Sequence, residues 1–144
     1  MNDAPSDNRE LLIVRASADA PVPGPEAYFT GNVTIATRYQ ADAPARIGGA
    51  TVSFAAGART AWHTHPFGQT LFIVSGMAVV QNDGRHAEKV GAGDVVFIPP
   101  HVRHWHGAGP SAPMVHFAVA EALDGNPVTW MEKVTDEDYA AATL

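Results

Sequence analysis

The sequence predicts a single all-β domain, folded as a β-sandwich or closed barrel. Three observations support this fold class. Short strand-like runs follow one another along the chain, with glycine, proline and Asn-Asp-Gly turns between them. No ten-residue segment in the middle of the chain carries the apolar period of a helix. The length of 144 residues suits one domain with one hydrophobic core.

The chain is expected to divide into an N-terminal arm over residues 1–27, a barrel over 28–134 and a C-terminal turn or tail over 135–144. In the arm, Leu11–Val14 is a candidate edge strand, whereas Ala20–Pro25 holds too many prolines for regular structure. Near the C-terminus, Thr135 can cap a short helical turn. The strand-like runs of the barrel are Val33–Tyr39, Ala50–Phe54, Thr60–His65, Thr70–Ser75, Met77–Gln81, Glu88–Val90, Val95–Ile98, Arg103–His106, Met114–Ala120 and Val128–Met131.

Composition and charge exclude several classes of function. The formal net charge is −6 and the chain has only two lysines, so a basic nucleic-acid footprint is absent. The absence of cysteine excludes disulfides, thiolate metal sites and cysteine nucleophiles. Met1–Ser6 is polar and acidic, unlike a secretory signal, and the longest apolar runs are too short to cross a bilayer. We therefore expect a cytoplasmic protein with a small-molecule substrate and no nucleic-acid or membrane partner.

The charged fraction of 17% is low, and the chain contains three tryptophans. Apolar surface is thus left to cover, which predicts a homodimer or homotetramer. A group of aromatic residues could line an apolar pocket, although such residues more often belong to a core or a subunit contact. These residues are Trp62, Phe72, Phe97, Trp105 and Trp130. Arg59 is expected to pair with Asp94 or Glu121.

Histidine is the unusual residue of this chain, since all seven lie between positions 63 and 116. Side chains two residues apart on a strand share a face, so His63 and His65 can offer two neighbouring imidazoles, and Gln69 can fold back toward them. His104 and His106 repeat the same-face pair. Imidazole and amide oxygen ligands suit Mn, Fe, Zn, Cu or Ni better than Ca or Mg. For any single histidine the alternative is an ordinary polar residue on a strand face.

Two motifs in this region resemble those of the cupin superfamily. The first is a glycine, a His-X-His pair, an acidic residue and a second glycine, which correspond here to Gly57, His63, His65, Gln69 and Gly76, with glutamine in the acidic place. The second motif corresponds to Gly93–His104, in which His101 stands where a glycine is expected. This resemblance implies a double-stranded β-helix, or jelly-roll, barrel with a metal inside its mouth.

A narrower resemblance extends from about Pro25 to Tyr139. The segments Gly57–Pro66, Gly68–Leu71, His104–Ala108 and Val128–Glu137 are similar to those of the small manganese cupins that include bacterial hydroxynitrile lyases. That resemblance implies one divalent metal per chain, with Mn as the first choice, Fe as the second, and Zn or Ni as metals acquired during purification. The metal ligands that it implies are His63, His65, Gln69 and His104. One departure is Ala120, because the lyases have a polar glutamine lining the pocket there.

The chemistry expected of this ligand set is Lewis-acid chemistry. Three neutral imidazoles and a neutral amide leave the full charge of a divalent ion to act on a bound hydroxyl or cyanide. In a lyase that cleaves cyanohydrins, the sequence favours His116 as the base, with His106 as a second group that handles or orients the proton. For each of these two histidines the alternative is a buried, hydrogen-bonded structural role. The alternative functions are an iron-dependent cupin dioxygenase and a non-catalytic cupin that binds a small molecule.

Overall fold

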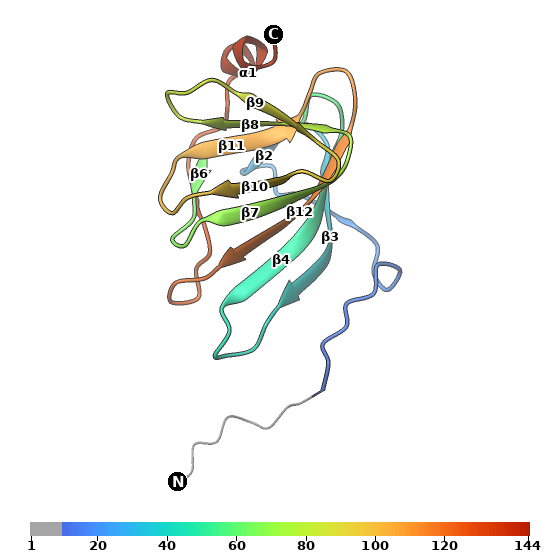
Figure 1. Cartoon of the computed structure of the whole chain (residues 1–144). Helices are drawn as coiled ribbons and strands as arrows, with labels where there is room; N and C mark the ends of the chain where they lie inside the picture. Colours follow the sequence, from blue (N-terminus) through green and yellow to red (C-terminus); the bar gives the residue numbers. More distant parts are fainter. Residues whose placement is uncertain (1–9) are drawn as a thin grey trace.

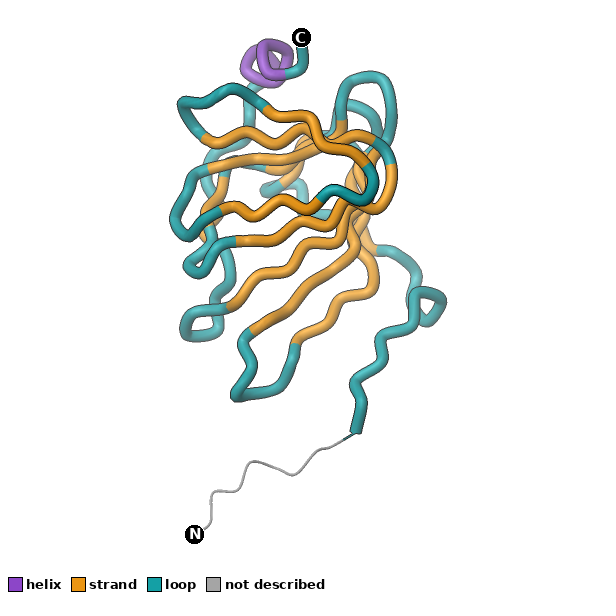
Figure 2. The backbone as a smooth tube through the Cα atoms, viewed as in Figure 1, coloured by secondary structure: helices purple, strands orange, loops and turns teal. Residues whose placement is uncertain are grey.

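The computed structural model describes residues 10–144 and consists almost entirely of curled antiparallel β-sheets (Figures 1 and 2). One sheet has the strand order β1-β3-β4-β12-β7-β10, and the other has the order β13-β6-β11-β5-β2, with β8 paired to β11 and β9 paired to β8. The strands are β1 (Val22–Pro23), β2 (Phe29–Thr30), β3 (Val33–Gln40), β4 (Ile47–Phe54), β5 (Arg59–Thr60), β6 (His63–Thr64), β7 (Gln69–Ser75), β8 (Met77–Asn82), β9 (Glu88–Gly91), β10 (Val95–Ile98), β11 (His104–Ala108), β12 (Met114–Glu121) and β13 (Thr129–Trp130). The predicted fold class is therefore confirmed.

The hydrophobic core lies between the inner faces of the two sheets. Alternate residues of the long strands point inward, as Leu71 and Ile73 do on β7, and pack against Phe54 of β4 and Met114 of β12. This alternation is the period-2 pattern from which the strands were predicted. A second, smaller cluster contains Trp62, Val79, Trp105, Val134 and Tyr139.

The only helix in residues 10–144 is α1 (Asp136–Ala142), and Thr135 caps it as the sequence predicts, because its side chain accepts a hydrogen bond from the Asp138 amide. Arg59, which is buried, donates to Asp136 Oδ1 at 2.7 Å and lies under the Tyr139 ring. The expected pairing of Arg59 with Asp94 or Glu121 is therefore wrong. The side chain instead anchors α1 to the barrel. No helix in the described residues is long and apolar enough to cross a membrane.

The N-terminal arm differs from the expectation in two places. Leu11–Val14 forms no strand and is exposed, so the predicted edge strand is absent. The proline-rich stretch does contribute a short strand, β1, which pairs with β3 at the edge of the sheet, where a proline costs no ladder bond. Residues 1–9 of the predicted arm lie outside the described residues.

A β-bulge interrupts β3 where it pairs with β4. Ala36 lies opposite Thr51, but the next paired residue is Tyr39, opposite Gly49, so β3 contains one residue more than its partner. Thr37 sits in this bulge with a φ of +47°, and its hydroxyl is hydrogen bonded to that of Thr51. Because side chains alternate faces, the extra residue reverses which residues of β3 face inward beyond this point.

The glycine position of the second motif retains the backbone conformation that a glycine would adopt. His101 occupies this position with a φ of +62°, in the left-handed region. Its amide donates to the carbonyl of His65, so the turn that precedes β11 is joined to the segment that carries the first two predicted ligands.

Candidate metal centre

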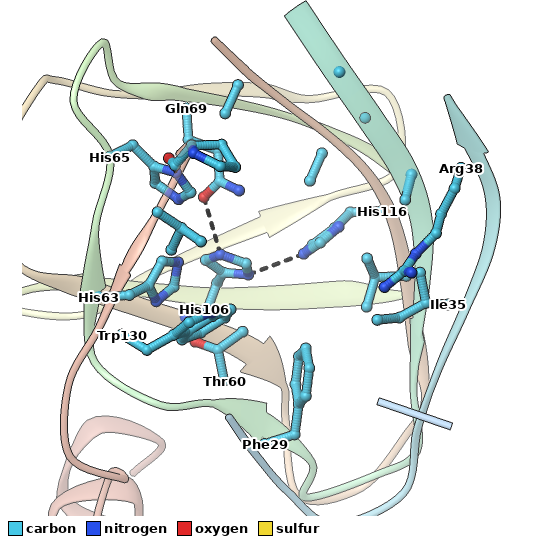
Figure 3. Close-up of a pocket in the computed structure, with 18 of the residues that line it drawn as sticks. Phe29, Ile35, Arg38, Thr60, His63, His65, Gln69, His106, His116 and Trp130 are labelled. Atoms are coloured by element: carbon cyan, nitrogen blue, oxygen red, sulfur yellow. Dashed lines mark hydrogen bonds between the residues drawn. The ribbon is translucent and has the colours of Figure 1, made fainter. Parts of the chain in front are cut away.

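Three of the predicted ligands, His63, His65 and Gln69, line a cavity between the two sheets (Figure 3). The fourth, His104, is not part of this lining but contacts Gln69 and His63. His63 lies on β6, His65 directly after it, Gln69 at the start of β7 and His104 on β11, where it pairs with His63 in the antiparallel register. All four side chains are buried, with exposed fractions of 8% or less. The rings of His63 and His104 have their centroids 4.1 Å apart, as expected of residues that share one centre.

The three predicted histidine ligands have one contact type in common. In each of them, Nδ1 is hydrogen bonded to a backbone carbonyl. A carbonyl oxygen only accepts, so Nδ1 carries the proton and Nε2 keeps a free lone pair. This is the arrangement that orients metal-binding imidazoles in proteins. The three bonds run from His63 to Ala61, from His65 to Pro127 and from His104 to Val102, at 2.8, 2.8 and 2.9 Å.

The contact between Gln69 and His104 indicates that a cation fits here. The Gln69 Oε1 atom lies 3.2 Å from His104 Nε2, and since Nδ1 of His104 holds the proton, both atoms are acceptors. In addition, Nε2 of His65 is buried without any hydrogen-bond partner. A divalent ion would replace the repulsion with two ligand bonds and would satisfy the unpartnered nitrogen. The alternative that relieves the repulsion without a metal is a reversed Gln69 amide.

His106 and His116 form a second type of contact. The Gln69 Oε1 atom also lies 3.2 Å from His106 Nε2, and His106 Nδ1 lies 2.9 Å from His116 Nε2 (Figure 3). Because the amide oxygen only accepts, His106 donates from Nε2, so its Nδ1 accepts the Nε2 proton of His116. Nδ1 of His116 is then an acceptor, and it has no partner although it is buried. This chain of hydrogen bonds leaves one unpaired basic atom at its end.

Burial keeps all five of these rings neutral at neutral pH. It is the largest cause that lowers the pKa of each, to about 4 for His104 and for His116. Mutual repulsion between neighbouring imidazoles lowers the pKa of His63 and His106 further. Neutral imidazole is the form that binds metal or accepts a proton.

One group of three histidines has nitrogen atoms close enough to share an ion. This group overlaps the predicted set of metal ligands but is not identical to it. The ligand nitrogens of His63, His104 and His106 all lie within 4.8 Å of one another. His65 lies outside this trio, and His106, which the sequence favours for proton handling, lies inside it. The Nδ1 partners separate the two kinds of ring, since His106 is the one in the trio that bonds to another histidine instead of a carbonyl. The assignment of His63, His65, Gln69 and His104 as ligands stays a prediction.

The cavity that leads to these residues has a volume of about 250 Å³ and mainly apolar walls. Its lining includes Phe29, Phe54 and Trp130, together with His106 and His116. Of the aromatic residues considered from the sequence, only Trp130 lines it. Trp62 and Trp105 belong to the smaller core cluster, and Phe72 and Phe97 are exposed on the outer face of the sheet.

Sequence analysis missed a charged residue in the lining of the cavity. Among the described residues, Arg38 is the only side chain with a permanent charge in the lining of the cavity. It enters from β3 at the far side from His63 and His65 in the view of Figure 3. Strict alternation from the buried Val33 and Ile35 would point Arg38 outward. The bulge around Thr37, which no simple sequence pattern signals, turns it toward the cavity, where its side chain remains exposed to solvent.

Comparisons with known proteins agree with this architecture. Residues 50–120 match the family described as the cupin domain. The chain is 50% identical over 129 residues to an (R)-mandelonitrile lyase of Granulicella tundricola, which covers 90% of this chain and 98% of that relative. It is 37% identical to a cupin-like protein of Thermotoga maritima whose crystal structure superposes with a TM-score of 0.79, over 93% of this chain and 98% of that one. A polyketide cyclase of Streptomyces resistomycificus, 18% identical over 94% of both chains with a TM-score of 0.64, shares the fold.

Proposed function

This chain belongs to the cupin family, and we propose that it is a metal-dependent lyase that cleaves or forms cyanohydrins, aromatic ones such as mandelonitrile among them. The observation that carries the proposal is the 50% identity to an (R)-mandelonitrile lyase over nearly the full length of both chains. The donor set of the site supports it, because buried neutral imidazoles and an amide oxygen meet at the end of an apolar cavity.

The residues that would hold a divalent ion are His63, His65 and His104, with Gln69 as an oxygen ligand. We propose Mn as the ion, with Fe as the next choice and Zn or Ni as metals found after purification. When bound, the ion would supply a Lewis acid that lowers the pKa of a substrate hydroxyl. Because all four ligands are neutral, this effect is not weakened by a charged ligand.

His116 would accept the hydroxyl proton of the cyanohydrin during cleavage. It lines the cavity, and its Nδ1 is the unpaired acceptor at the end of the chain that starts at Gln69. His106 holds the His116 ring in this tautomer through the bond of 2.9 Å. Loss of the proton lets the C–C bond break, with aldehyde and cyanide as products. In the synthetic direction the same proton returns to the new hydroxyl.

The aryl ring of such a substrate would lie against the apolar wall. Phe29 and Trp130 contact each other there, with ring centroids 5.9 Å apart, and Trp130 also stacks on Tyr28. Ala120, at the other wall, offers no hydrogen bond to the substrate. We therefore expect slower turnover than in a relative with a polar side chain at this position.

The proposal includes a homodimer or homotetramer. Phe72 and Val74 of β7 and Val95 and Phe97 of β10 project from the outer face of one sheet, with exposed fractions between 43% and 61%. Val95 lies opposite Phe72 in the register, so these side chains are adjacent. A second copy of the chain would remove this apolar face from water.

The test uses protein purified without metal and then loaded separately with Mn, Fe or Zn. The Mn-loaded protein should release benzaldehyde from mandelonitrile well above the rate in buffer, and it should consume no oxygen. A His116→Ala variant should retain its metal and lose about 10²–10⁴-fold in turnover, because it removes the base and not a ligand. His86→Ala, which changes an exposed histidine in the β8–β9 turn, is the matched control. Oxygen uptake by the Fe-loaded protein without lyase activity would favour a dioxygenase instead.

A further inference from the structure

The β3 bulge places Arg38 on the inner face of the sheet. Without the bulge, the regular alternation of side chains would place it on the outer face. Beyond the bulge, Tyr39 faces outward and stacks on Phe117 of the outer face, with ring centroids 6.2 Å apart. Arg38 and Gln40 therefore face the same side as the inward residues of β4. The left-handed φ at Thr37 is a conformation that costs energy in a β-branched residue. Such strain is typical of sites where a side chain is aimed for a function.

The permanent charge of the cavity lining is positive. Among residues 10–144, the lining contains no aspartate, glutamate or lysine, and Arg38 is its one permanently charged residue. Arg38 makes no ion pair with any of residues 10–144. An arginine that lines a cavity without an acidic partner is available to pair with an anionic ligand.

The walls beside Arg38 leave room for that ligand. Gly48 and Ala50 of β4 lie opposite Ala120 and Ala118 of β12 in the register, and all four line the cavity. Because these residues are small, they fill little of the space inside the cavity. The volume of about 250 Å³ lies just below the roughly 300–1,000 Å³ of drug-sized pockets, so it suits a small molecule.

We propose that Arg38 binds a carboxylate group of the substrate, so that the preferred substrates are small compounds that carry a carboxylate at the end remote from the reacting carbonyl or hydroxyl. The guanidinium fork matches the two oxygens of a carboxylate. A single arginine balances one negative charge, which favours a carboxylate over a phosphate. The inference deepens the proposed function, since it names the substrate class of the same cavity, but it concerns binding and is measured without turnover.

The experiment compares two ligands of nearly equal shape, 4-carboxybenzaldehyde and the neutral 4-carbamoylbenzaldehyde, by calorimetric titration. The quantity measured is the ratio of their Kd values, in metal-free and in Mn-loaded protein. The parent should bind the carboxylate about tenfold more tightly, because hydrogen bonds to charged groups are stronger than neutral ones. Raising the salt concentration should reduce this preference, because Arg38 is exposed to solvent.

The Arg38→Met variant should lower the ratio to about one, and Arg38→Lys should keep part of the preference because it keeps the charge. Arg85→Met, which removes an exposed arginine from the β8–β9 turn, should leave the ratio as in the parent. An unchanged ratio in Arg38→Met, or a parent without any preference, would overturn the role of Arg38. Mandelonitrile cleavage by the same preparations tests the proposed function separately. Lyase activity can be absent while the preference for the carboxylate remains, and lyase activity can be present without that preference.

Discussion

Acid should destabilise the metal-free protein, and His116 should carry a measurable share of the effect. This side chain is fully buried, and burial lowers its pKa from 6.5 to about 4. As pH falls below 6.5, His116 therefore becomes protonated in the unfolded chain but stays neutral in the folded chain. The free energy of unfolding falls over the interval between these two pKa values, and the loss is complete below pH 4.

The two pKa values set the size of this loss. Each pH unit between them is worth up to about 1.4 kcal/mol, so the step from pH 7 to pH 5 removes about 2 kcal/mol through His116 alone. The pKa values of His63, His65, His104 and His106 are also lowered, and these rings add to the loss in the same direction. Against a total stability of about 5–15 kcal/mol, the loss through His116 alone is already substantial.

The assay is urea unfolding followed by tryptophan fluorescence, in chelator, at several pH values between 7 and 5. The variant is His116→Gln, because its amide N–H can still donate to His106 Nδ1 while the titrating ring is gone. Its unfolding free energy should fall by about 2 kcal/mol less than that of the parent over this interval. His86→Gln removes an exposed histidine and should follow the parent. Parallel curves for His116→Gln and the parent would refute the reasoning.

Further predictions concern the ligands, the core, the cavity and the outer face. His104→Ala should lose most divalent metal in elemental analysis, and unchanged occupancy would favour the reversed Gln69 amide. Tyr139→Phe removes a buried bond of 2.7 Å to the Ala108 carbonyl and should lower the unfolding free energy by about 1–2 kcal/mol in the urea assay. Ala120→Gln should raise mandelonitrile turnover severalfold, and a slower variant would contradict the role given to this wall. Phe97→Glu should reduce the mass in light scattering to near 15.2 kDa, whereas a parent already at that mass would exclude the oligomer.

The barrel could be predicted from the sequence because it depends on local patterns, whereas the full set of residues at its centre was implied by the resemblance of two motifs to those of cupins. Strand alternation places His63 and His65 on one face, and the fixed spacing to Gln69 spans a tight turn in which Gly68 adopts a φ of +83°. His104 returns to this point because β11 pairs with β6. This pairing joins residues far apart in the sequence, so the sequence predicted it only through the resemblance of the two motifs to those of cupins.

Other features depend on contacts that no local pattern encodes. Leu11–Val14 has the composition of a strand but no partner strand in the structure, so propensity alone misleads. Arg59 pairs with Asp136, 77 residues away, because α1 packs over the smaller core cluster. Arg38 enters the cavity only because β3 gains one residue at Thr37, and a bulge of this kind changes the register without a distinctive residue type.

The different roles proposed for the five imidazoles follow from their hydrogen-bond partners, because the residue type is the same in all of them. A ring whose Nδ1 donates to a carbonyl, as in His63 or His104, cannot exchange its tautomer without leaving a buried acceptor unpaired. His106 and His116 bond to each other, so once Nδ1 of His116 has taken up a proton, the Nε2 proton of His116 can cross to Nδ1 of His106 while both inner nitrogens stay paired. The first kind of ring is suited to present a lone pair at a fixed point. The second is suited to move a proton, which is the distinction that metal analysis of His104→Ala and turnover of His116→Ala would measure.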